Sequence, residues 1–286
     1  MTSLYYKSVL EGIVYLSSNI GKNTLKIVFS VILLSIFSWG FAFGDEPILI
    51  TKSVYMDKID FDGRWSFQTE WKKSSLNTLT YDDGMTIYLR TAHQGEFIYV
   101  FVDPVSDIHL DKHSDRALIC FSGENNKSNL PNSDDYCFGT TLDVSKTFTY
   151  QGGSPFKFTS HFRQIESPEN YIAISSVSNE YDRYSKIPHP SYEFRIPTEL
   201  VGRSSQYGFF LSVYDAYNNK AYLWPQNITI NNPFQIPGPN LWGEMISPDK
   251  SLPEFNMPII AFVSTIFLLV LITKFSNKQN LSVFSS

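Results

Sequence analysis

Carboxylates and imidazoles alternate along one short segment of the chain. Every second position of this segment is an aspartate or a histidine: Asp107, His109, Asp111, His113 and Asp115. On an extended chain alternate side chains point to the same side, so the pattern predicts a row of ligands for a divalent cation. Carboxylates favour calcium, whereas imidazoles favour zinc or copper. The alternative is a solvated loop between two strands, with Ile108 and Leu110 packed on its other face.

Two further aspartates follow apolar runs. Asp103 and Asp215 each end a predicted strand, where a carboxylate either caps the next turn or projects towards a ligand, and Asp103 is the one we assign to a ligand site. The pairs Asp82-Asp83 and Asp134-Asp135 are adjacent in sequence. On strands the members of such a pair point apart and cannot act together as acid and base, so they indicate turns.

Aromatic residues offer a second kind of site. Trp224, Phe234 and Trp242 lie in surroundings rich in Pro and Asn, where exposure is more plausible than in a strand, and they are the candidates for a stacking surface. Trp65 and Trp71 are expected to fill the core instead. For each candidate the competing interpretation is ordinary packing.

Several classes of function have no support in the sequence. The chain has no Gly-rich phosphate loop, no Gly-x-Ser-x-Gly elbow and no His-Glu-x-x-His pattern, so the sequence indicates a protein without catalytic activity. The net charge of −5 is spread without basic clusters. Nucleic acid is therefore not an expected partner.

The elements that must position these residues are predicted to be strands. Residues 85–90 and 97–102 alternate between apolar and polar side chains on either side of Gln94-Gly95, which predicts a β-hairpin. Further strands are predicted at residues 117–121, 146–150, 156–162, 171–177, 192–196, 207–214 and 221–224, with a short one near Trp242. The expected fold is an all-β antiparallel sandwich of the jelly-roll kind.

Two apolar segments bracket this region. Residues 27–43 follow Lys22 and Lys26, and they predict a signal peptide or signal anchor over residues 1–44, with cleavage after Gly44. Residues 258–274 are predicted to form a transmembrane helix, with residues 248–257 as a stalk and 275–286 as a cytoplasmic tail. The sandwich, residues 45–247, is then extracellular and held at the cell membrane.

Cysteines and sequons agree with export. Cys120 and Cys137 are the only cysteines, and a pair outside the cell predicts a disulfide. Asn126 and Asn227 begin Asn-x-Ser/Thr sequons in the same region, so both are candidate glycosylation sites.

Several local patterns, in order, resemble the family 9 carbohydrate-binding modules and the wider DOMON-like sandwiches. They are Asp62-Gly63-Arg64-Trp65 with Glu70-Trp71, the strand 97–102 ending in Asp103-Pro104, Asp115 before residues 117–121, then Glu193 to Pro197, Gly208 to Asp215, Trp224-Pro225 and Leu241 to Met245. The resemblance covers residues 48–247. It implies a non-catalytic domain that holds a sugar against aromatic rings, sometimes with calcium, and that is often an accessory to polysaccharide breakdown.

The chain departs from that family at the sugar clamp. Where the family has two tryptophans, this sequence has His109, Lys112 and His113 in one neighbourhood and Phe234 and Ile236 in the other. Phe234 alone could replace one of the two rings.

The C-terminal tail carries a second resemblance. Pro253-Glu254-Phe255, an apolar segment and then Lys274 and Lys278 are similar to the Pro-Glu-Phe sorting signals of archaeal surface proteins. Such a signal implies that a sortase exchanges the helix for another anchor, whereas a plain transmembrane anchor keeps it.

The sequence therefore predicts a membrane-tethered extracellular module that binds a saccharide or glycoconjugate. The alternative is a structural envelope protein whose sandwich packs against neighbouring envelope proteins without a sugar ligand. A third hypothesis is a haem-binding DOMON-like domain, with Met85 or Met245 and His161 as axial ligands.

Overall fold

We analysed a computed structural model, which describes residues 47–52, 58–123, 125–142 and 146–247. The predicted signal segment, stalk, transmembrane helix and tail lie outside the described residues. Within the described ranges no helix has both the length and the apolar character needed to cross a membrane.

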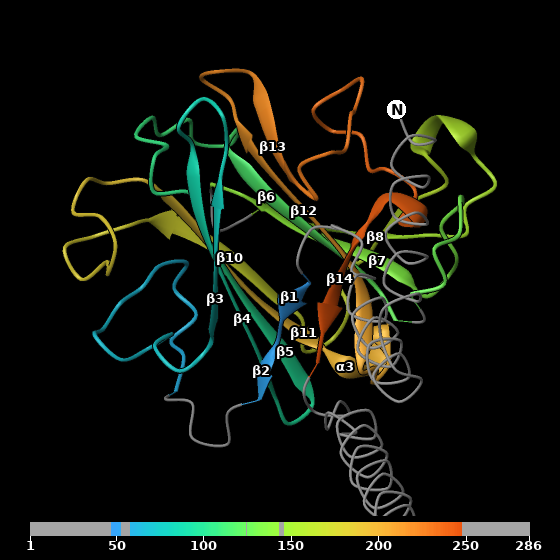
Figure 1. The fold of residues 1–286 in the computed structure, drawn as a ribbon, viewed down its shortest axis with the longest axis horizontal. Coiled ribbons are helices and arrows are strands. Elements are labelled where there is room, and N and C mark those ends of the chain that lie inside the picture. The colour runs from blue at the N-terminus through green and yellow to red at the C-terminus, as the bar shows by residue number, and fades with distance from the viewer. Residues whose placement is uncertain (1–46, 53–57, 124, 143–145, 248–286) are drawn as a thin grey trace, which may run out of the picture. The chain divides into compact units, whose positions relative to one another are not determined.

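The described chain folds into two β-sheets (Figure 1). The larger sheet has the order β1-β14-β12-β6-β7-β8-β9, with β13 also paired to β12. Its strands are β1 (Ile48–Leu49), β6 (Arg116–Ser122), β7 (Asp135–Thr141), β8 (Thr147–Gln151), β9 (Arg163–Ile165), β12 (Gln206–Asp215), β13 (Lys220–Trp224) and β14 (Gly243–Ile246).

The smaller sheet has the order β10-β11-β5-β4-β2, with β3 also paired to β4. Its strands are β2 (Thr51–Lys52), β3 (Ser75–Thr80), β4 (Thr86–Gln94), β5 (Phe97–Asp103), β10 (Ile172–Val177) and β11 (Pro190–Pro197). The helical elements are short: η1 (Lys157–Thr159), α3 (Thr198–Val201) and η2 (Pro239–Leu241). Pairing is antiparallel except between β1 and β14 and between β2 and β4.

The core lies between the two sheets because each central strand turns alternate apolar side chains inward. On β6, Ile119 and Phe121 face the core, while Arg116 and Leu118 remain partly exposed on the other face. The facing strand β5 contributes Val100 from the smaller sheet. This alternation confirms the predicted hairpin and the predicted sandwich of β-sheets.

The outer face of the smaller sheet is covered by the segment before β3. Trp71 stacks on Phe101 with ring centroids 5.3 Å apart, and Trp65 is equally buried. Glu193 on β11 accepts hydrogen bonds from the Trp71 indole N–H at 2.9 Å and from the Gly63 N–H at 2.8 Å. The expectation that both tryptophans fill the interior is confirmed.

A disulfide joins β6 to β7 on the outer face of the larger sheet. Cys120 and Cys137 are cross-strand partners and are bonded, as predicted. Both are buried in a second apolar layer with Phe162, Phe210 and Trp242. This layer covers the outer face of the larger sheet.

Two expectations about strands need correction. Residues 156–162 form η1 and turns instead of a strand, because Ser160 and His161 have φ angles of 54° and 64°. Asp135, expected in a turn, instead begins β7, which was not predicted.

Candidate functional site

The tryptophans proposed as a stacking surface lie in the interior. Trp224 is 5% exposed and packs on Phe209, and Trp242 is 3% exposed with its indole N–H donating to the Pro237 carbonyl at 3.0 Å. The expectation for these two residues is corrected, because Trp224 faces the core between the sheets from strand β13 and Trp242 packs in the apolar layer on the outer face of the larger sheet. Phe234 is different: 52% of it is exposed.

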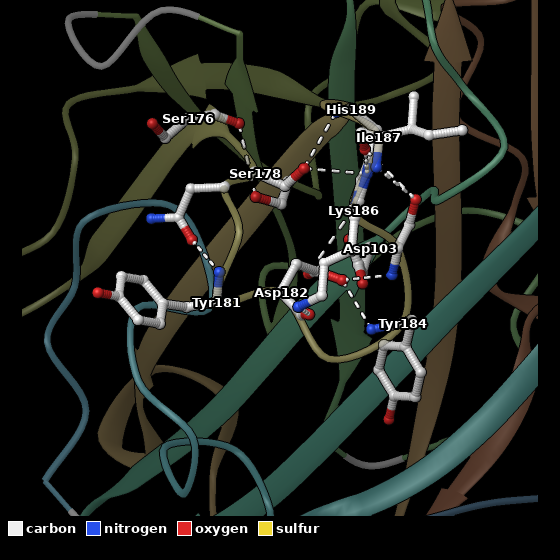
Figure 2. Close-up of polar contacts among 12 residues, drawn as sticks. Asp103, Ser176, Ser178, Tyr181, Asp182, Tyr184, Lys186, Ile187 and His189 are labelled. Carbon is white, nitrogen blue, oxygen red and sulfur yellow. Dashed lines mark hydrogen bonds and ion pairs between the residues drawn. The ribbon is translucent and has the colours of Figure 1, made fainter.

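Asp103 is also buried, at the centre of a polar network (Figure 2). Its Oδ1 lies 2.7 Å from His189 Nε2, and the Nδ1 of the same ring lies 2.7 Å from the Ile187 carbonyl oxygen. Asp182 Oδ2 is 3.9 Å from His189 Nε2. Because the carbonyl accepts only, Nδ1 carries a proton, and a second proton is shared between Nε2 and Asp103.

The charges of this network compensate one another. Burial raises the pKa of Asp103 to about 6, although the hydrogen bond and the charge of His189 act in the opposite direction. Burial alone would lower the pKa of His189, but the bond to Asp103 and its charge outweigh it and raise that pKa. Arg90 adds a further positive charge close enough to lower the pKa of Asp103. The bond from His189 to Asp103 Oδ1 ties the turn before β11 to the end of β5, whereas Asp103 Oδ2 is buried without a hydrogen-bond partner.

A second buried group contains part of the predicted metal row. Ligand oxygens of Asp107, Asp115 and Asp215 all lie within 4.8 Å of one another, and each residue is at most 2% exposed. The third member of this group is Asp215, at the end of β12. His109, Asp111 and His113 of the predicted row are not part of it. Asp215, expected to cap the turn after its strand or to project towards a ligand, accepts from the Asn218 N–H at 3.0 Å and also lies beside the two carboxylates of the loop before β6.

Backbone N–H groups hold these carboxylates in place. Asp115 accepts from the N–H groups of Asp111 at 2.7 Å and Ala216 at 3.0 Å. Asp107 accepts from His109 N–H at 3.2 Å. Burial, together with the repulsion among the carboxylates, raises the pKa of Asp107 to about 7 and that of Asp115 to about 6. Three acidic groups at such spacing form a pocket of oxygen atoms suited to a hard cation.

The other members of the row lie differently. The His109 ring stacks on Tyr217 with centroids 3.5 Å apart, and His113 has a φ of 67° in a turn. Ile108 and Leu110, expected to pack inward, are 55% and 39% exposed. The segment is a loop of turns, so strict alternation does not apply to it.

The outer face of the larger sheet carries a groove, whose floor follows from strand register. Ser212, Leu118, Gly139 and Phe148 are successive cross-strand partners on β12, β6, β7 and β8. Tyr214 and Arg116 are also cross-strand partners, two residues further along β12 and β6 from Ser212 and Leu118. Because partners share a face, these side chains all point away from the core.

Gly139 provides the depth of this floor. A Cβ placed there would lie 2.1 Å from the Phe148 ring, so the ring occupies space that any other residue at position 139 would need. The ring therefore lies across β7 and forms an apolar base for the groove.

Two loops form the walls, one around η1 and one between β13 and η2. In Figure 1 they are the lime-green and orange segments near the β8 label. The groove has a volume of about 580 Å³. Its lining is Arg116, Leu118, Phe148, Tyr150, Phe158, Thr159, Ser160, Phe162, Gln164, Ser212, Tyr214, Asn232, Pro233, Phe234, Gln235 and Ile236.

Phe234 belongs to an aromatic and cationic cluster at one side of the groove. Its ring centroid lies 4.8 Å from that of Tyr214, in an edge-to-face arrangement, and 3.5 Å from Arg116 Cζ. Of the three residues predicted to form a stacking surface, Phe234 is the one that lines this groove. Arg116 and Tyr214 were not singled out from the sequence, although their outward positions follow from strand alternation.

The remaining candidates fall elsewhere. Met85 and Met245 are packed in the core between the sheets, while His161 Nδ1 lies 3.0 Å from the Ser154 carbonyl oxygen in the η1 loop. This arrangement gives no support to haem ligation by these residues. Asn126 and Asn227 are both exposed.

Comparison with known proteins gives little beyond these observations. No protein-family model matches the chain, and no curated protein matches it. Two solved structures of a family 9 carbohydrate-binding module from Caldicellulosiruptor kristjanssonii are similar in fold. One, in complex with cellotriose, has 14% identity and a TM-score of 0.44 over 71% of this chain and 93% of that chain. The other, with glucose, has 13% identity and a TM-score of 0.43 over 71% and 95%. Similarity at this level carries no argument about function.

Proposed function

We propose that this protein is a saccharide-binding module that holds its ligand in the groove on the larger sheet. The observation that carries the proposal is the lining, in which exposed aromatic rings lie beside amides and hydroxyls. A pyranose has an apolar face that packs on such rings, and its hydroxyls bond to polar groups at the ring's edge. The volume of about 580 Å³ is within the usual range for small-ligand sites.

Binding without catalysis fits the same lining. Glycoside hydrolysis generally uses two carboxyl groups flanking the scissile bond. Among the described residues that line the groove there is no Asp or Glu. We therefore assign the groove to recognition.

The test is binding of the full chain to an oligosaccharide array, followed by calorimetry on each ligand found. Phe234→Ala should weaken binding about tenfold, because it removes an exposed ring that lines the groove beside Arg116. Leu76→Ala is the matched control, because Leu76 is 45% exposed but lies on β3 of the other sheet. A wild-type chain that retains no glycan would refute the function.

We also propose that calcium binds between Asp107, Asp115 and Asp215. The proximity of three buried carboxylates supports this, and so does the Tyr192 hydroxyl, which is buried without a hydrogen-bond partner. That hydroxyl is near enough for all three charges to contribute to its raised pKa, after the larger effect of burial. A cation offsets the repulsion and gives the oxygens a common ligand.

Thermal unfolding with calcium and with a chelator tests this assignment. Calcium should raise the Tm of the wild type and of Glu166→Gln, a substitution at an exposed acid. Calcium should leave the Tm of Asp215→Asn unchanged. Equal Tm values with calcium and chelator in the wild type would exclude the site.

An extracellular position, held at the membrane by the apolar segments, remains our proposal for location. The disulfide and the two exposed sequon asparagines, Asn126 and Asn227, support an oxidising and glycan-accessible compartment. A membrane-impermeant biotinylation reagent applied to intact cells should label the domain. Labelling confined to lysed cells would contradict this location.

A further inference from the structure

The groove has a single charged side chain among its described lining residues, and that side chain is Arg116. The rest of the lining is apolar, aromatic, hydroxyl or amide. A ligand in this groove therefore meets one positive charge and, from these residues, no negative one.

Arg116 has no acceptor of its own in the described structure. Its recorded contacts are with rings: Cζ lies 3.5 Å from the Phe234 centroid and 5.4 Å from that of Tyr214. Lys127, beyond the other end of β6, differs, since its Nζ donates to the Trp242 carbonyl at 2.7 Å and faces Glu244. The guanidinium donors of Arg116 are thus available to a ligand.

The electrostatics of Arg116 point the same way. Burial lowers its pKa, and the groups that partly oppose this effect are the phenols Tyr150 and Tyr214. A guanidinium stays charged in proteins, and a partly desolvated charge without a counter-ion is unfavourable unless something pairs with it. The aromatic faces compensate in part.

Two amides at the rim add further donors. The Asn232 side-chain oxygen accepts from Phe234 N–H at 2.8 Å, and the Gln235 side-chain oxygen accepts from Asn231 N–H at 3.1 Å. Each oxygen already accepts one N–H, whereas neither NH₂ group donates to an acceptor within the described residues. Both NH₂ groups are therefore donors open to a ligand at this side of the groove.

We propose that the groove selects an acidic saccharide, in which a sugar-ring carboxylate of the uronic acid type binds the Arg116 guanidinium while the ring packs against Phe234. This inference rests on the proposed saccharide function and names its ligand class. A carboxylate is planar and matches the donor fork of arginine, which lysine or an amide does not reproduce.

The experiment is calorimetry of the full chain with a uronic acid oligosaccharide and with its carboxyl-reduced, neutral counterpart. The uronate should bind at least about tenfold more tightly, as expected of a hydrogen bond between charged groups. The preference should shrink as salt is raised. A sulfated derivative of the neutral oligosaccharide forms the third arm.

Substitutions assign the preference to Arg116. Arg116→Gln should bind both oligosaccharides equally, and Arg116→Lys should keep a reduced preference. The matched control is Arg195→Gln, because Arg195 also lies over two rings, Phe61 and Phe97, but on the smaller sheet. Tm values check that each variant folds. If Arg116→Gln does not fold, the reduced preference of Arg116→Lys for the uronate decides the test.

The outcomes separate this inference from the function beneath it. Equal binding of acidic and neutral oligosaccharides by the wild type would overturn the acidic class and leave saccharide binding standing. Tighter binding of the sulfated derivative than of the uronate would overturn the carboxylate assignment. Binding of none of the three would overturn both proposals.

Discussion

Gly139 and Phe148 are cross-strand partners, and the ring of one lies where the side chain of the other would be. A Cβ at position 139 would be 2.1 Å from the Phe148 ring. Strand β7 thus omits a side chain at the point where β8 supplies a large one. The shape of the groove floor depends on this pair.

Gly139→Ala should displace the Phe148 ring and weaken saccharide binding by at least about tenfold, at a cost of about 1–3 kcal/mol in stability. The contact is with the end of a side chain, so the strand itself can remain in place. Calorimetry and chemical denaturation measure the two effects.

The double variant Gly139→Ala/Phe148→Ala supplies the control. Removing the ring makes room for the new methyl group, so the stability costs of the two single substitutions should not add. Strict additivity would show that the two residues do not share the space inferred here.

Loss of the disulfide should destabilise the domain and also weaken binding. Replacing both Cys120 and Cys137 by alanine should cost about 2–5 kcal/mol in the free energy of unfolding. The bond lies in the apolar layer with Phe162 and Ile236, which also line the groove. Denaturation with and without a reductant measures the effect, and the double variant should not respond to the reductant.

Stability should depend on pH through the pair Asp103 and His189. Both groups have raised pKa values, so the folded protein binds protons more tightly than the unfolded chain and the free energy of unfolding falls as pH rises. The contribution of Asp103 to the free energy of unfolding is lost between pH 3.8, the ordinary pKa of the group, and about pH 6. The contribution of His189 is lost at pH values above 6.5, the ordinary pKa of that group.

Tm measurements from pH 4 to 8 check this dependence. The difference in Tm between wild type and His189→Gln should be largest at low pH and narrow by a few degrees as pH rises through neutrality. A difference that widens over this interval would contradict the predicted sign.

Glu193 should be essential to the cover on the smaller sheet. Glu193→Ala leaves the Trp71 indole N–H and the Gly63 N–H buried without their acceptor, at a cost of about 2–5 kcal/mol. Glu199→Ala, at an exposed position on α3, should change the free energy of unfolding by less than about 0.5 kcal/mol. Urea unfolding monitored by tryptophan fluorescence follows both variants.

The central strands could be predicted from sequence because burial on one face leaves an alternating pattern. The alternating pattern correctly predicted strands β4, β5 and β6. It failed for β7, since Gly139 interrupts the pattern for a reason that lies on another strand. Residues 156–162 showed the reverse error, because an aromatic-rich sequence folded into turns.

The candidate sites were harder to predict, because they join distant residues. Asp107 and Asp115 were recognised, but their partner Asp215 is 100 residues further along the chain. Trp224 and Trp242 were expected outside because their neighbours are polar, yet both are buried, Trp224 on the core face of β13 and Trp242 against Phe162 and Phe210. Arg116 gave no local signal, since its importance comes from the absence of an acidic partner for it among the described residues.

The parallel pairing of β1 with β14 has a practical consequence for engineering. Ile48 and Met245 are register partners, so the chain enters and leaves the described fold at adjacent points. A short flexible linker could join these points, and new ends could be opened in an exposed loop of the smaller sheet. Such a circular permutant would keep the groove intact, and the same adjacency would let the domain be inserted into a loop of a reporter protein as a glycan probe.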